Sequence, residues 1–388
     1  MRWAGVVVFL FVWTLTTHGK YSAAGDEPHY LIIDQSLLAD GDLDLDNNYR
    51  HDDGRLFGHS GLEVEGHAVT SRVGPFRPFH NIGLPLVILP AYAAARALST
   101  IPGDSLLRRF RMDRGLFTYS IVSLFLTGLT ALGLALTASG LRAAVAPRTA
   151  GALVVLAGIS PPIASQAFLV FPEVVALFVT CLVVWFTTRR AAEGDERRLA
   201  WLALALGALP WMHPKFTLYA AGLLFAALYA RRDTIGRRFW FPIAAFVAPQ
   251  VVLALWTWRE WGTPWGAQAV NGLPFSVHAL GSGLPGLLID RQSGVLAYAP
   301  IYAVVPACFA LTWKRTWPWA VPLALLYLPS AAFMEWWGGF ATPARGGRGP
   351  GDSAARHRRR RLAAPEDPVA VGRRQSRPRV ARPRRTGF

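Results

Sequence analysis

The stretch GLFTYSIVSLFLTGLTALGLALTASGL, residues 115–141, contains no charged side chain. An α-helix of this length rises about 40 Å, more than the ~30 Å hydrocarbon core of a bilayer. Further uncharged runs recur at residues 3–19, 149–172, 239–258, 292–313 and 316–334. Only 16% of the 388 residues are charged, against about 25% in soluble domains. The sequence therefore predicts an all-α, polytopic membrane helix bundle of about eight to eleven spans, because helices satisfy their own backbone groups in lipid.

The distribution of basic residues predicts how these spans are oriented. Cytoplasmic loops of membrane proteins carry an excess of lysine and arginine. Basic segments separate the apolar runs at residues 108–114, 189–198, 231–238 and 314–315. We expect these segments inside, so that the first span exits, residues 20–80 lie outside and a span near residues 81–101 returns. The chain is predicted to be a multi-pass protein of the inner (plasma) membrane whose first loop is extracytoplasmic.

The number of crossings between the basic segments near residues 114 and 189 is left open by the sequence. If both of these segments lie inside, the chain crosses the membrane an even number of times between them. Three apolar pieces nevertheless lie between them, at residues 115–141, 149–172 and 174–188. Either one piece is re-entrant or interfacial, or the arginines between two pieces face outside against the charge rule. The next two pieces are shorter and predict a hairpin with its turn on the outer side, at residues 213–215.

The outer loop opens with a predicted helix, EPHYLIIDQSLLA, residues 27–39. Pro28 suits the first turn of a helix, where its missing N–H has no intrahelical partner to lose. Apolar side chains recur on one side at helical spacing, and Asp34 and Gln35 fall on the other. We expect this amphipathic helix to lie on the membrane surface, with Asp26 and Glu27 close to the outer headgroups.

The sequence does not predict a metal site or a cofactor. Residues 42–53, DLDLDNNYRHDD, have aspartate at alternate positions, but Asn47 stands where a calcium loop needs glycine. We interpret this run as a solvated turn. Six of the nine histidines fall within residues 18–80, but none has the HExxH spacing of a zinc site. A divalent metal is therefore conceivable but unsupported.

Five short motifs in a fixed order give the chain a resemblance to a known superfamily. They are DE at 26–27, FPE at 171–173, PWMHPK at 210–215, DRQSGVLAYAP at 290–300 and WWGGFATPAR at 336–345. Their order along residues 1–345 resembles the GT-C membrane glycosyltransferases, in particular the bacterial, mannosyltransferase-like branch that uses sugars on polyprenyl phosphate. The resemblance implies inverting transfer of a sugar to a lipid or glycan acceptor on the outer face, with an Asp or Glu base.

Carried over residue by residue, the resemblance assigns the catalytic acid that acts on the acceptor to Asp26, with Glu27 beside it. The second acid falls on Glu173, where members of the family often have aspartate, and this departure weakens the assignment. A phosphate leaves as an anion without needing a proton, so one general base is enough. The departing phosphate needs a cation, and the candidates on the outer side are Lys215, Arg291 and Arg345.

The rival interpretation is a non-catalytic membrane protein, either a transporter or a cell-envelope assembly factor with an acidic docking loop. A transporter commonly shows paired, broken half-spans in two repeats, and we find no internal repeat in the sequence. The enzyme interpretation implies a lipid-linked sugar donor, a lipid or glycan acceptor and membrane lipids as partners. Nucleic acid is not expected, because the basic tail begins outside.

The last segment, residues 346–388, differs in composition from everything before it. It holds thirteen arginines and three acidic residues, with few large apolar side chains. Such a segment cannot bury a core, and we expect it to be a disordered Arg/Pro-rich tail beyond a membrane domain of residues 1–345. A shifted reading frame of a GC-rich gene would give the same composition, in which case the chain is an inactive, truncated fragment.

Overall fold

The computed structural model describes residues 2–16, 23–64, 66–190, 195–270 and 275–336. Arg345 and the basic tail lie outside these residues, so the disorder expected of the tail stays a prediction. In the part described, helices account for nearly all regular structure, which confirms the all-α prediction. The one sheet assigned there is a two-stranded hairpin, β1 (Ala68–Val69) and β2 (Arg77–Pro78), paired antiparallel.

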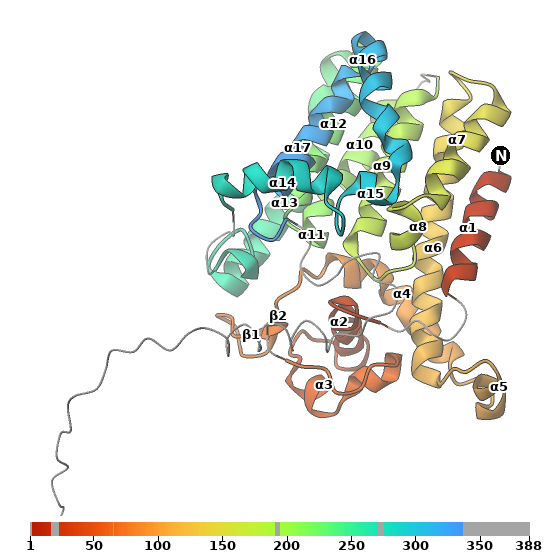
Figure 1. Cartoon of the computed structure of the whole chain (residues 1–388). Helices are drawn as coiled ribbons and strands as arrows, with labels where there is room; N and C mark the ends of the chain where they lie inside the picture. Colours follow the sequence, from red (N-terminus) through yellow and green to blue (C-terminus); the bar gives the residue numbers. More distant parts are fainter. Residues whose placement is uncertain (1, 17–22, 65, 191–194, 271–274, 337–388) are drawn as a thin grey trace, which may run out of the picture. The chain divides into compact units, whose positions relative to one another are not determined.

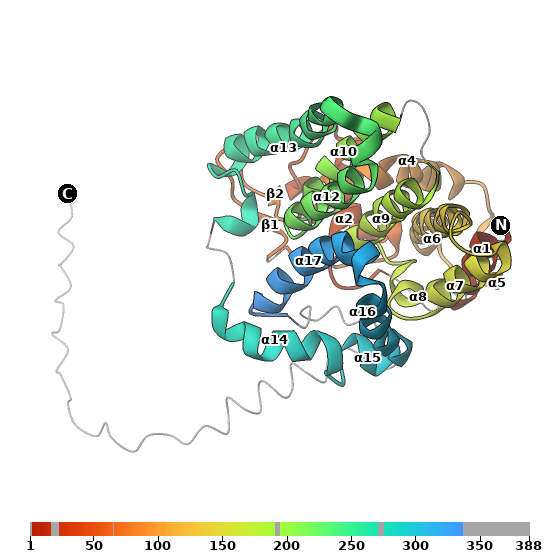
Figure 2. The ribbon, with the colours of Figure 1, turned by 90° about the horizontal axis from the view of Figure 1, so that it is seen from above.

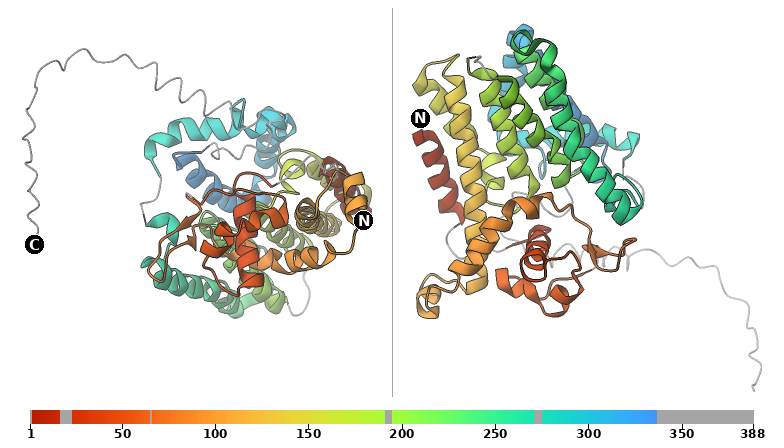
Figure 3. Two further views of the ribbon diagram at one scale, coloured as in Figure 1. Left: turned by 90° about the horizontal axis from the view of Figure 1, so that it is seen from below. Right: turned by 180° about the vertical axis from the view of Figure 1, so that it is seen from behind.

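The longer helices lie side by side, and residues 23–80 cover one end of them (Figures 1, 2 and 3). The principal helices in the chain are α1 (Arg2–Thr16), α2 (Glu27–Ala39), α4 (Gly83–Leu98), α6 (Arg114–Leu141), α7 (Pro147–Ile159), α9 (Pro172–Thr188), α10 (Asp195–Gly207), α12 (Phe216–Ile235), α13 (Trp240–Trp261), α14 (Val277–Ile289), α16 (Val305–Thr316) and α17 (Ala320–Ala332). Short helices between them are α3 (Asp46–Arg50), α5 (Asp104–Arg109), α8 (Ile163–Gln166), α11 (Leu209–Met212) and α15 (Val295–Tyr298), with 3₁₀ turns at Asp53–Phe57, Gly236–Phe239, Ala267–Ala269, Pro300–Val304 and Trp317–Trp319.

Small residues allow these helices to approach one another closely. A side chain at Gly5 would collide with the backbone of Ala131 on α6, and one at Gly207 with the backbone of Phe246 on α13. Gly133 lies directly against Cys181 of α9. Contacts of this kind are typical of helices that pack in lipid, where backbones approach through glycine and alanine rather than through large apolar side chains.

Two of the described helices are long and apolar enough to cross a membrane, namely α6 and α13. In α6, half of the most apolar window is buried by neighbouring helices, whereas in α13 only 11% of it is buried. The side of α13 that is left open carries Phe241, Val252, Leu255 and Trp258, each about half exposed or more. The other apolar helices are shorter, so a bundle of many spans stays a prediction at this stage.

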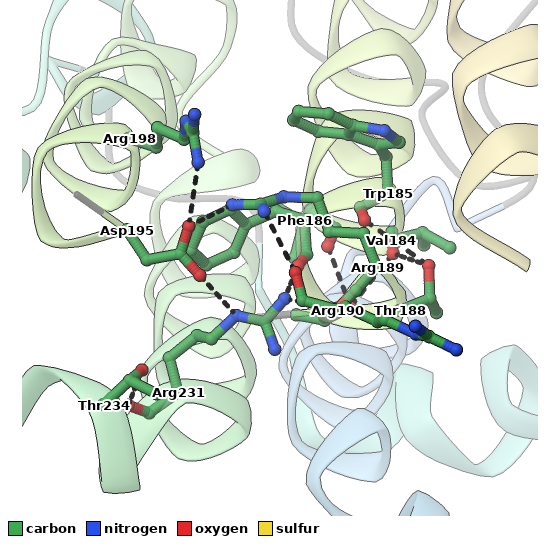
Figure 4. A network of polar contacts seen from close by, with 12 residues as sticks. Val184, Trp185, Phe186, Thr188, Arg189, Arg190, Asp195, Arg198, Arg231 and Thr234 are labelled. Carbon is green, nitrogen blue, oxygen red and sulfur yellow. Dashed lines mark hydrogen bonds and ion pairs between the residues drawn. The ribbon is translucent and has the colours of Figure 1, made fainter. Parts of the chain in front are cut away.

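The end of the helices opposite residues 23–80 is rich in arginine, and we call it the basic end. Asp195, which is 2% exposed, lies there among three arginines (Figure 4). Its carboxylate pairs with Arg189, with Arg198 at 3.3 Å and with Arg231 at 3.3 Å. Arg231 also donates to the backbone oxygens of Phe186 and Arg189, the latter at 2.7 Å. This network fastens the end of α9 to α10 and α12.

The predicted return span at residues 81–101 is wrong, because α4 does not connect the two ends. Gly83 at its start packs against the backbone of Trp211 in α11. Tyr92 in its middle donates a 2.8 Å hydrogen bond to Gln35 of α2. The following segment reaches Gly115, which packs on the backbone of Gly58. The basic segment 108–114 therefore lies at the same end as residues 23–80, which we call the acidic end.

This correction resolves the count of apolar pieces between residues 114 and 189. Because α6 begins at the acidic end and α9 finishes at the basic end, the chain has to run along the helices an odd number of times. The pieces α6, α7 and α9 do so in turn, and Gly158, near the end of α7, packs against Val8 and Leu134. No re-entrant piece is needed. The basic segments near residues 114 and 189 were expected on the same side, and the structure places them at opposite ends of the helices (Figure 1).

The helix predicted at residues 27–39 has those bounds in the structure, but its predicted surface position is wrong. Every residue from Glu27 to Ser36 is buried. Leu31, Ile32 and Ile33 have no exposed surface and belong to the main hydrophobic core. The polar side of the helix is covered by α4, whose Tyr92 meets Gln35. A helix buried from Glu27 to Ser36 is part of the core of the protein and does not present an apolar face to lipid.

Two further segments compare differently with their predictions. The hairpin expected around residues 213–215 is present, with α11 ending at Met212 and α12 beginning at Phe216. The sequence analysis predicted no helix between α13 and residue 291, where the structure has α14. This helix is only 13 residues long, too short for a span.

Candidate functional site

Glu27, predicted to be catalytic, is buried and held by hydrogen bonds from three other residues. Its side chain is 1% exposed. It accepts hydrogen bonds from the Tyr119 hydroxyl at 2.7 Å, the Val170 N–H at 2.8 Å and the Ala24 N–H at 3.2 Å. These bonds join the start of α2 to α6 and to the segment that precedes α9. A carboxylate held in this way is not free to approach a substrate, so we correct the catalytic assignment of Glu27 to a positioning one.

Asp26, the neighbouring residue, faces a different environment. It is the N-cap residue of α2, but its side chain makes no capping hydrogen bond, and it is only partly buried. Its carboxylate lies with the imidazoles of His67 and His80, and one ligand atom of each of the three residues lies within 4.8 Å of the other two. The sequence identified Asp26 but missed both histidines. The only signal available was the concentration of histidine in residues 18–80.

The hairpin of β1 and β2 brings the two histidines together. Ala68 pairs with Pro78, and the register continues into a 3.0 Å hydrogen bond from the Phe79 N–H to the His67 carbonyl. His67 and His80 therefore leave adjacent ends of the same hairpin. Nδ1 of His67 and Nε2 of His80 lie 3.0 Å apart. A separation of 13 residues in the chain becomes a direct contact because the strands are antiparallel.

A third imidazole completes this group of histidines. The His29 ring stacks on the His67 ring with centroids 3.4 Å apart and an interplanar angle of 7°. Nδ1 of His29 lies 2.9 Å from the Tyr49 hydroxyl. Burial lowers the pKa of His29 to about 3 and that of His80 to about 4, and burial also lowers the pKa of His67. All three rings are therefore neutral at physiological pH, which allows them to stack without charge repulsion.

Glu173 and Lys215 form the second part of the site. Glu173 lies in the first turn of α9 and Lys215 immediately before α12, and their side chains form an ion pair. The pair is accessible to solvent, with side-chain exposures of 41% and 36%. An exposed pair of this kind is worth only about 0–1 kcal/mol. The lysine is therefore held near Glu173 but remains available to another anion.

Tyr30 and His213 connect the two parts. The Tyr30 ring lies 4.9 Å from the His80 ring, and its hydroxyl lies within electrostatic reach of both Glu173 and Asp26. Burial, reinforced by these two carboxylates, raises the pKa of Tyr30 above its usual value, so the phenol stays protonated. His213 interacts electrostatically with both Lys215 and His80, and burial lowers the pKa of His213 well below the usual value. Tyr30 and His213 thus lie between the Asp26 group and the Glu173–Lys215 pair, and a single site containing Asp26, Glu173 and Lys215 stays a prediction.

The remaining predicted cations do not join this group. Arg291 is exposed in the turn after α14, and its side chain makes no hydrogen bond or ion pair with the residues that the structure describes. Arg345 lies outside the described residues. Of the three predicted phosphate ligands, Lys215 is therefore the one whose position supports the role.

Residues 42–53, interpreted from the sequence as a solvated turn, form turns together with the helix α3, and Leu45 and Asn48 within them are buried. The Asp42 carboxylate accepts from the Asp44 N–H at 3.0 Å, and the Asp44 carboxylate from the Asp46 N–H at 3.2 Å. Asp42 and Asp44 each cap the backbone two residues further on, Asp46 pairs with Arg50 at 2.9 Å, and Asp53 accepts a 3.0 Å hydrogen bond from Asn48.

Comparison with known proteins adds nothing to this geometry. The chain matches no protein-family model, no curated protein and no solved structure. The likeness to the GT-C superfamily rests on the short motifs, and the function has to be argued from the arrangement of the residues.

Proposed function

We propose that the chain is a multi-span glycosyltransferase of the plasma membrane that moves a sugar from polyprenyl phosphate to an acceptor hydroxyl on the extracytoplasmic face. The observation that carries the proposal is the gathering, at one end of the apolar helices, of an accessible carboxylate, Asp26, and an accessible cation, Lys215. They come from segments far apart in the sequence and are linked through Tyr30, His80 and His213. A lipid-borne substrate reaches such a site from the bilayer.

The chemistry needs one group of each charge. Asp26 accepts the proton of the acceptor hydroxyl as the oxygen attacks the anomeric carbon from the side opposite the phosphate. The bond between that carbon and the phosphate oxygen breaks, and the polyprenyl phosphate leaves as an anion. Lys215 stabilises the negative charge that develops on it. Glu173 holds the lysine in place, and its side chain makes way for the phosphate because the pair is weak.

Basic residues lie at both ends of the helices. The basic end carries Arg142, Arg148, Arg189, Arg190, Arg197, Arg198, Arg231, Arg232, Arg238, Lys314 and Arg315. Tyr229 contacts the Trp317 ring at 4.9 Å, which places the segment after Lys314 beside the end of α12. Basic residues are typical of the cytoplasmic side, but the acidic end also carries arginines, among them Arg108, Arg109, Arg111 and Arg114. The outward orientation of the acidic end is therefore part of the proposal, and the next experiment tests it.

We expect cysteine labelling in intact cells to show this orientation. The positions to test are exposed in the structure: Ser60 and Ser105 at the acidic end and Ala144 at the basic end. Each is replaced by cysteine in a Cys308→Ser background, because Cys308 is exposed and Cys181 is buried. A membrane-impermeant thiol reagent should modify Ser60→Cys and Ser105→Cys before lysis, and Ala144→Cys only after it. Ser105 labelled on the side opposite Ser60 would contradict the shared acidic end.

The activity itself is tested with the full chain in membranes. Radiolabelled sugars on polyprenyl phosphate are supplied one at a time, and free polyprenyl phosphate and labelled product are measured. We expect turnover with at least one donor, dependent on the chain and absent with the same sugar on a nucleotide. Vesicles without the chain are the control. No turnover with any polyprenyl-phosphate donor, by protein shown to be folded, would favour the non-catalytic interpretation.

A further inference from the structure

We propose that Asp26, His67 and His80 form a binding site for a divalent transition-metal ion of the Zn²⁺ class. The inference goes beyond the proposed glycosyl transfer and does not depend on it. It rests on three side chains of metal-ligating type that originate in two separate elements, the start of α2 and the β1–β2 hairpin, and converge with one ligand atom each within 4.8 Å. Among the residues that the structure describes, this is the one such group.

The spacing fits a single ion. Zinc binds imidazole nitrogen and carboxylate oxygen at about 2.0–2.2 Å, so two ligands of one ion lie roughly 3–3.5 Å apart. The 3.0 Å between Nδ1 of His67 and Nε2 of His80 falls in this range. The Asp26 carboxylate oxygen lies within 4.8 Å of both nitrogens, and no capping hydrogen bond holds the carboxylate away from the third position.

The choice of ligands selects the class of ion. Imidazole suits zinc, iron, nickel and copper, whereas magnesium and calcium require oxygen ligands. Two histidines and one carboxylate are also the number that leaves a fourth position open on a tetrahedral ion, as catalytic zinc sites do. The set therefore matches a site that binds a further oxygen ligand better than a closed structural site.

The surroundings hold the ligands in place. His29 stacks face to face on His67, and the Tyr49 hydroxyl, 2.9 Å from Nδ1 of His29, orients the stacked ring. His80 is 8% exposed and contacts Tyr30. These contacts restrict the rotation of both ligand rings. The alternative is a metal-free group in which His67 and His80 share one hydrogen bond.

The consequence for catalysis rests on the proposed function. With one oxygen of Asp26 on the ion, the other oxygen remains free to accept a proton. The ion would offer its open position to the acceptor hydroxyl, whose pKa would fall on binding. Asp26 would then hold the ion and serve as the base in the same step.

Metal binding is tested on the full chain, purified in detergent without a polyhistidine tag. Co²⁺ is titrated into protein stripped of metal, and its visible absorption is recorded. We expect one ion per chain, displaced by an equal amount of Zn²⁺. His67→Gln, His80→Gln and Asp26→Asn should each weaken Co²⁺ binding by more than the ~10–100-fold that follows loss of an outer-shell partner. His278→Ala, at an exposed histidine on α14, is the matched control and should bind as the unchanged protein does.

Two results would overturn the site: no stoichiometric ion in the unchanged protein, or equal binding by His67→Gln and His278→Ala. The thermal midpoint of each variant identifies any that has not folded. If one ligand variant fails to fold, the other two still test the site. Sugar transfer is measured separately, with and without a chelator. Sugar transfer by protein that binds no metal would contradict the metal site and leave Asp26 acting as a base without an ion. Metal binding by protein that transfers no sugar would contradict only the proposed enzyme function.

Discussion

Replacing Asp195 with alanine is expected to destabilise the helix bundle by about 3–5 kcal/mol, the usual cost of removing one partner from a buried ion pair. The carboxylate is 2% exposed and pairs with Arg189, Arg198 and Arg231. Its loss leaves Arg189 and Arg231 with positive charges that are largely buried, at side-chain exposures of 16% and 7%. The aromatic rings that these arginines contact, those of Trp185 and Phe186, cannot replace the lost carboxylate.

The chain offers a matched control for this variant. Asp233 is also an aspartate at the basic end and pairs with Arg232, but its side chain is 87% exposed. Asp233→Ala should change stability by no more than about 0–1 kcal/mol. Denaturant unfolding in detergent, followed by tryptophan fluorescence, compares the two. Equal midpoints for both variants would show that the network in Figure 4 contributes little to holding α9, α10 and α12 together.

The sequence predicted the helices well where local pattern decides them. The bounds of α2 agree with the predicted 27–39, and α6, Arg114–Leu141, agrees within one residue with the uncharged run 115–141. Both follow from properties that neighbouring residues share, namely absence of charge and helical periodicity. The surface position of α2 could not be obtained in this way, because burial of its polar side depends on α4, some 50 residues further along the chain.

The expectation that the basic segments 108–114 and 189–198 lie on the same side was wrong for a similar reason. The relative positions of these segments depend on how many helices run between them, and the contact of Gly115 with Gly58 that fixes residue 114 at the acidic end joins residues 57 positions apart. The group of histidines could not be predicted from the sequence either. The contact between His67 and His80 depends on the register of a hairpin whose strands are only two residues long.

Replacing Asp26 with asparagine is expected to reduce sugar transfer by about 10²–10⁴-fold, the usual contribution of a general base. Asparagine keeps the shape of the side chain and can still accept a hydrogen bond, but it cannot take a proton at neutral pH. The fold should survive, because Asp26 is only partly buried and does not cap α2 with its side chain. The measurement is the rate of polyprenyl phosphate release at saturating donor, alongside the thermal midpoint.

Three companion variants make this result interpretable. Asp42→Asn, an exposed acid of the same loop, should leave transfer unchanged, because asparagine still accepts from Ser36 and Asp44. Glu27→Gln should lower the thermal midpoint, because the bonds to Tyr119 and Val170 weaken when the acceptor loses its charge. Asp26→Asn should do the reverse, losing transfer while keeping stability. If it transferred sugar at a near-normal rate, a base at the start of α2 would be excluded, and the charge that matters at the acidic end would have to be that of Glu173.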